Sequence, residues 1–195
     1  MAYDARERRG KMLVDDTKLF LTLLHADLAS HSHLCSRDNL LPTARLNCLS
    51  DIDWLDIDYS LFLKNPGIQF IDYTKVYTRL FRVNPTNYHL TYSFNEKTPK
   101  GLIEKIFQTT RYNVAVALPS DHPAIRQVLH TGKGTATLLG VEYPTILGDE
   151  SDLRHLDPRG HLVLLEWKKS LKKDKTPLEK NRFYNIGANS LQVLQ

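Results

Sequence analysis

Polar side chains close several of the strands that the sequence predicts. In a parallel α/β sheet the carboxyl ends of the strands meet at one edge, where loops present side chains over an open crevice. Lys75 or His89 would serve there as acid or base, and the aspartates would orient a substrate or metal ion. Alternatively, each residue only caps a helix or completes a turn. The candidate catalytic residues are Asp51, Asp72, Lys75, His89 and Ser93.

The densest polar motif is GDESDLRHLDPRG, over residues 148–160. Its three carboxylates could bind a divalent cation through oxygen ligands, although the spacing is not that of a calcium loop. Arg154 could instead pair with one aspartate in an ordered loop that turns at Asp157 and Pro158. We favour the structural interpretation and assign no metal; the residues concerned are Asp149, Asp152, Arg154 and Asp157. Asp149 also belongs to the enzyme interpretation.

Two histidines and a cysteine alternate at His31, His33 and Cys35. They would align as metal ligands only in an extended segment, with a fourth ligand such as Cys48. The paired CxxC and HxxxH spacings of zinc sites are missing, so we interpret this stretch as a polar connection. Cys48 falls within a predicted strand, where cysteine acts as a small core residue.

Basic residues are concentrated near the C-terminus. Residues 168–182 carry a net charge of +5, whereas the whole chain carries +4, so the rest of the protein is close to neutral. Phosphate backbones attract such clusters through counterion release, and the neighbouring aromatic residues could stack on bases. A solvated, non-specific tail is the alternative. The predicted nucleic-acid-binding residues are Lys168, Lys169, Lys172, Lys173 and Lys175.

Helical periodicity predicts a helix over residues 12–29, followed by a polar connection. A second helix is expected after Thr98 as its cap, and a third from Pro123 to a stop at Gly132. Apolar runs between turn signals predict the strands. These cover residues 44–50, 68–73, 88–93, 113–118 and 162–167, with further extended segments at 137–141 and 144–147.

This alternation of strands and helices predicts an α/β fold with a mainly parallel sheet. We expect a partial or irregular βα-barrel-like sheet with an N-terminal helix, forming one domain over residues 1–167, and a basic segment over 168–195. Two cysteines exclude a disulfide framework. No apolar run is long enough to cross a membrane and no secretory signal is recognised, so we expect a cytoplasmic protein with no membrane partner.

Several stretches resemble a known family. They are RLNCLSDIDW (45–54), IQFIDYTKV (68–76), NYHLTYS (87–93), NVAVAL (113–118) and GDESDLRHLDPRGHLVLL (148–165). Together they resemble the phage gene 88 proteins, whose succession of βα units is distantly similar to radical S-adenosylmethionine barrels. The resemblance implies a phage origin and location in the host cell. The chain has no CxxxCxxC triad, so we expect no iron–sulfur cluster.

The leading hypothesis is therefore a phage accessory protein that engages nucleic acid through its lysine-rich segment. One alternative is an enzyme or small-ligand-binding protein with a site at the strand ends. The other is a structural or host-interaction protein without chemistry. The sequence assigns no reaction, cofactor or oligomeric state.

Overall fold

The computed structural model describes residues 2–48 and 50–167. These residues form two compact units. Unit 1 contains the chain up to Phe70 together with Pro85–Tyr88, and unit 2 contains Ile71–Asn84 and the chain from His89 onward. The predicted lysine-rich segment lies outside the described residues.

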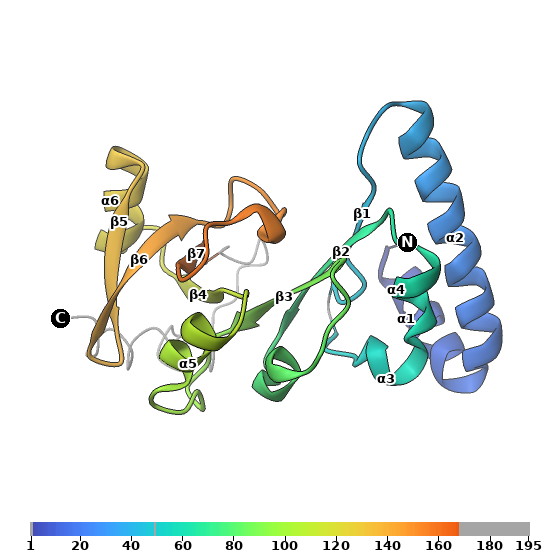
Figure 1. Ribbon diagram of the computed structural model, residues 1–195, viewed down its shortest axis with the longest axis horizontal. Coiled ribbons are helices and arrows are strands. Elements are labelled where there is room, and N and C mark those ends of the chain that lie inside the picture. The colour runs from blue at the N-terminus through green and yellow to red at the C-terminus, as the bar shows by residue number, and fades with distance from the viewer. Residues whose placement is uncertain (1, 49, 168–195) are drawn as a thin grey trace. The chain divides into compact units, whose positions relative to one another are not determined.

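Unit 1 begins with two long helices, α1 (Ala2–Asp15) and α2 (Thr17–Arg37), which pack on each other (Figure 1). The prediction of one helix over residues 12–29 was wrong at both ends. Asp16 starts a new helix because its carboxylate accepts a hydrogen bond from the Leu19 N–H at 2.9 Å. Helix α2 continues to Arg37 and ends shortly before Asn39, which takes a left-handed conformation with φ of 54°.

The His31, His33 and Cys35 stretch is therefore helical, and its interpretation as a polar connection was wrong. One turn of helix separates His31 from Cys35, whose sulfur lies 3.7 Å from His31 Nδ1. The other ring nitrogen of His31 lies 3.2 Å from the carbonyl oxygen of Thr43. The histidine thus links α2 to the start of the sheet.

The first predicted strand is much shorter than expected. Strand β1 covers only Thr43–Ala44, and the described residues from there to Asp53 form a loop. Asn47 organises this loop: its Oδ1 accepts hydrogen bonds from Ser50, Ile52 N–H and the Trp54 indole. These local bonds replace a strand ladder. Cys48 is consequently exposed, so its prediction as a buried strand residue was wrong.

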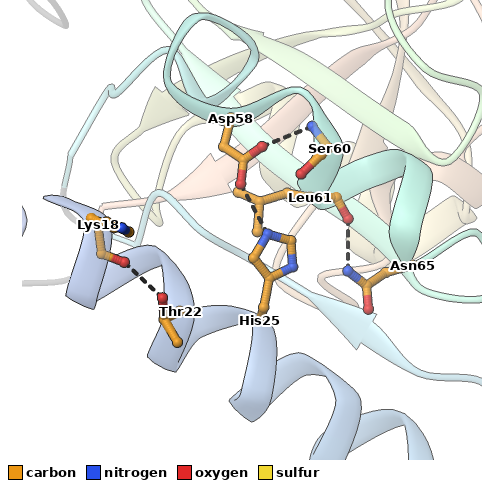
Figure 2. Close-up of polar contacts among 7 residues, drawn as sticks. All are labelled: Lys18, Thr22, His25, Asp58, Ser60, Leu61 and Asn65. Atoms are coloured by element: carbon orange, nitrogen blue, oxygen red, sulfur yellow. Dashed lines mark hydrogen bonds and ion pairs between the residues drawn. The ribbon is translucent and has the colours of Figure 1, made fainter.

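Two short helices, α3 (Trp54–Asp58) and α4 (Ser60–Lys64), follow this loop. Figure 2 shows how Asp58 ties them to α2: its carboxylate lies 2.9 Å from His25 Nε2 and 2.9 Å from the Ser60 nitrogen. Burial would raise the pKa of Asp58, but hydrogen bonds from Ser60 and His25 outweigh it and hold the pKa below its ordinary value.

Aromatic side chains form the core of unit 1 beneath α4. Phe62 packs on Phe70 with ring centroids 5.0 Å apart, and on Tyr88 at 4.5 Å. Beside them, the Asn87 amide donates hydrogen bonds to the carbonyl oxygens of Phe62, Asn65 and Ile68. These bonds satisfy backbone groups at the turn that leads into the sheet.

The sheet has seven strands in the order β1-β2-β3-β4-β7-β6-β5. The strand pairs β1/β2, β3/β4, β4/β7 and β6/β7 are parallel, and β5/β6 is antiparallel. The expected mixed α/β fold with a partial, barrel-like and mainly parallel sheet is confirmed. The remaining strands are β2 (Gln69–Thr74), β3 (Tyr88–Ser93), β4 (Val114–Leu118), β5 (Gly134–Leu138), β6 (Val141–Leu147) and β7 (Leu162–Glu166).

Two helices connect strands in unit 2, α5 (Leu102–Thr109) and α6 (Pro123–Thr131), and two short 3₁₀ turns, η1 (Tyr77–Phe81) and η2 (Arg154–Leu156), lie in the loops. The predicted stop of α6 at Gly132 is confirmed, since this glycine has φ of +68°. Thr98 does not cap α5: its hydroxyl bonds Tyr92 and the Asn95 N–H, and the helix begins only after Gly101. Among the described helices, none has both the length and the apolar character needed to cross a bilayer.

Candidate functional site

The residues expected at the strand ends are divided between the two units. Asp51 lies half-buried in the loop of unit 1, whereas the other four lie in unit 2. Asp72 is 2% exposed on β2, Lys75 follows that strand at the surface, and Ser93 ends β3. Three of the five therefore lie at or near the carboxyl ends of neighbouring strands. Their proposed catalytic role stays a prediction.

His89 lies at the opposite end of β3. Four residue-to-residue steps of extended chain lead from it to Ser93, a distance of roughly 13 Å. His89 is buried, and its Nε2 has no hydrogen-bond partner among the described residues. Loss of hydration and the nearby charges of Arg111, His155 and Arg154 lower the pKa of His89 to about 4. The imidazole is therefore neutral at pH 7.

The buried imidazole predicts a loss of stability in acid. The pKa of His89 is lower in the folded than in the unfolded protein. The contribution of this group to the free energy of unfolding is therefore full above about pH 6.5 and falls as pH drops toward 4. We expect the free energy of unfolding to lose about 2 kcal/mol through this group between pH 7 and pH 4.5. Denaturant unfolding across this range should show a flatter profile for His89→Phe than for the wild type. His130→Gln, which removes an exposed imidazole, should keep the wild-type profile; equal profiles for all three proteins would contradict the assignment to His89.

The GDESDLRHLDPRG loop is held together by its own charged residues. Arg154 is only 3% exposed; it donates to the Ser151 carbonyl oxygen, and its Nη1 lies 3.3 Å from Asp157 Oδ2. Burial raises the pKa of Asp157, while Arg154 and His161 act against that rise. Asp149 accepts a hydrogen bond from the Glu166 N–H, and Asp152 is exposed. The predicted pairing of Arg154 with an aspartate is therefore present.

Within residues 2–48 and 50–167, no three histidine, cysteine or acidic side chains are grouped so that they could hold a metal ion. Asp149 points instead to a backbone N–H group and Asp157 to Arg154, which are partners of an ordered loop.

A pocket of about 760 Å³ lies at the amino ends of the strands, away from the carboxyl ends where a site was expected. It is lined by η1 and the residues that follow it, by the end of α5, by the loop before β4 and by the loop before β7. Because β3, β4 and β7 run parallel, the loops that precede them meet at their amino ends. The pocket is therefore at the edge opposite to the one expected for a ligand site.

Positive charge dominates this pocket. Among the described residues that line it, none is an aspartate or glutamate. Two cations also lie over aromatic rings: Lys105 Nζ is 4.7 Å from the Phe81 ring centroid, and Arg111 Cζ is 5.4 Å from that of Tyr112. The basic lining residues are Arg82, Lys105, Arg111 and Arg159.

Two asparagines fasten the loops that form the pocket. The Asn84 amide donates to the Arg79 carbonyl oxygen and to the Tyr112 hydroxyl, both at 3.0 Å. The Asn113 amide donates to the Pro158 carbonyl oxygen at 2.8 Å and accepts from the His161 N–H at 3.2 Å. These bonds join segments far apart in the sequence, so they set the positions of the cations relative to one another.

None of these four basic residues stands out in the sequence as a candidate site residue. Each is an ordinary surface cation when considered alone, and they belong to three separate segments of the chain. One local signal was available: an arginine adjoins an aromatic residue at Phe81 and Arg82, and again at Arg111 and Tyr112. Arginine beside aromatic side chains is common where proteins bind nucleic acids.

The fold defines the class of protein as mixed α/β with a mainly parallel sheet. The family described as Gene product 88 matches the chain over residues 2–182. The chain therefore belongs to this family, and the resemblance to phage gene 88 proteins is confirmed. The distant similarity to radical S-adenosylmethionine barrels is not supported by this match. Comparisons with curated proteins and with solved structures give no match to the chain.

Proposed function

We propose that this phage protein binds nucleic acid in the cytoplasm of the host cell. The observation that carries the proposal is the pocket at the amino ends of β3, β4 and β7, with four basic and no acidic lining residues among those described. Nucleic-acid backbones bind such surfaces because cationic side chains displace condensed counterions.

The lysine-rich segment supports the same function through its composition alone. It carries +5 over residues 168–182 in a chain whose other residues sum to about −1. A basic pocket and a basic segment would both contact phosphates, and each would add to the affinity and to its dependence on salt. The proposal thus has two separable parts.

The test is a titration of a labelled 30-nucleotide DNA strand, followed by fluorescence anisotropy, at several salt concentrations. We expect binding at low salt that weakens steeply as salt rises. The pocket variant Lys105→Gln/Arg159→Gln should bind about tenfold more weakly, since each lost phosphate contact removes part of the counterion release. Replacing Lys168, Lys169, Lys172, Lys173 and Lys175 with glutamine should also weaken binding.

A matched control removes two positive charges elsewhere in unit 2. Lys100→Gln/Arg126→Gln changes two exposed cations that do not line the pocket. Its affinity should stay within about threefold of the wild type, because neither cation lines the pocket and exposed charges that do not contact the strand are screened by salt. Absence of binding at low salt would refute the proposed function.

A further inference from the structure

Proteins that contact the bases of a single strand usually offer an aromatic ring on which a base can stack. The pocket contains two such rings, Phe81 and Tyr112. Both already contact cations of the same chain, Lys105 and Arg111 respectively. Whether a base can reach the faces of these rings therefore decides whether the pocket can bind bases by stacking.

Tyr112 is enclosed on several sides. It is 4% exposed, its hydroxyl accepts a hydrogen bond from Asn84, and the His89 ring meets it at 5.3 Å with an interplanar angle of 79°. A base could not stack on this ring without displacing Arg111 or the buried His89. Phe81 is 36% exposed, and Lys105 lies over its face.

The neutral donors of the Asn84 amide and of the threonine hydroxyls are already used within the protein. Its threonine hydroxyls donate to backbone carbonyl oxygens within α5, Thr109 to Lys105 and Thr110 to Ile106. No lining carboxylate is present among the described residues to accept hydrogen bonds from the amino groups of bases. Lys105 and Arg159 bring an ammonium and a guanidinium group to the pocket as charged donors, and guanidinium groups match phosphate oxygens in a bidentate geometry.

We infer that this pocket binds the phosphates of a nucleic-acid strand and does not read its bases. The aromatic rings hold Lys105 and Arg111 in place, and the cations contact the strand. Recognition at this site is then independent of base sequence. This inference rests on the proposed function, because it specifies what the same pocket contacts.

The test compares two strands of equal length, a DNA strand of mixed sequence and an abasic strand that keeps the deoxyribose phosphates but carries no bases. Both are titrated with the full-length wild type, with Lys105→Gln/Arg159→Gln and with the control Lys100→Gln/Arg126→Gln. We expect the wild type to bind the two strands with dissociation constants within threefold of each other. The pocket variant should lose about tenfold in affinity for both strands, and the control should not.

The outcomes separate the inference from the proposed function. Binding of the DNA strand with more than threefold weaker binding of the abasic strand would overturn the inference and leave nucleic-acid binding standing. Equal binding of both strands by the pocket variant and the control would also overturn it, since the phosphate contacts would then lie elsewhere. If neither strand binds, the proposed function fails together with the inference.

Discussion

Replacing Asn47 with alanine should destabilise the protein by about 3 kcal/mol, because several polar groups lose their partners at once. The asparagine is 3% exposed, and its Oδ1 accepts from the Trp54 indole at 3.1 Å and from the Ile52 N–H at 3.0 Å. Trp54 is itself 3% exposed, so its N–H would be left buried without this acceptor. Denaturant unfolding of the wild type and Asn47→Ala measures the loss.

Two further variants test how much of this loss of stability comes from individual hydrogen bonds of Asn47. Ser50→Ala removes a single donor to Asn47, from an exposed residue, and should cost about 0.5 kcal/mol. Asn47→Asp keeps the acceptor but loses the amide that donates to the Ile52 carbonyl oxygen, so its cost should be intermediate. A loss below about 1 kcal/mol for Asn47→Ala would show that the loop does not depend on these bonds.

The second large effect is expected at Gly148, where an alanine should cost about 2 to 3 kcal/mol. A Cβ at this position would lie 2.5 Å from Leu165 Cδ2 and 2.6 Å from Val163 Cγ1, far inside van der Waals contact. It would also lie 3.0 Å from Arg154 Nη1. The stiff side chain of Val163 cannot move aside cheaply within β7, so the strand or the loop must shift.

Gly67→Ala is the matched control. A Cβ at Gly67 would meet nothing within 4 Å, and we expect its unfolding free energy to stay within about 0.5 kcal/mol of the wild type. Thermal or denaturant unfolding of both variants makes the comparison. Equal stability of Gly148→Ala and Gly67→Ala would mean that the loop after β6 is not packed against β7 as described.

Much of unit 2 could be predicted from the sequence. The strand expected over residues 88–93 is β3, and those expected over 113–118 and 162–167 differ from β4 and β7 by one residue at an end. Their apolar runs report burial on both faces of a parallel sheet, which is a local property of the chain. The end of α6 at Gly132 was equally predictable from a local preference.

Unit 1 was predicted less well, for reasons visible in particular residues. Polar residues after position 30 suggested a connection, yet a helix accepts polar side chains on its exposed face and α2 continues to Arg37. Residues 44–50 suggested a strand, but the hydrogen bonds of Asn47 hold the described residues after Ala44 in a loop. In both places, contacts formed only on folding decide between two local structures that the sequence permits.

The sequence by itself determined the mixed α/β class, the family and the concentration of positive charge near the C-terminus. Only the tertiary structure placed a second basic site at the amino ends of β3, β4 and β7. That site joins residues 80–84, 105–112 and Arg159, which are held together by side-chain bonds of Asn84 and Asn113. Periodicity along a chain reports which face of an element is buried, whereas a pocket depends on which distant loops those non-local bonds bring to the same edge.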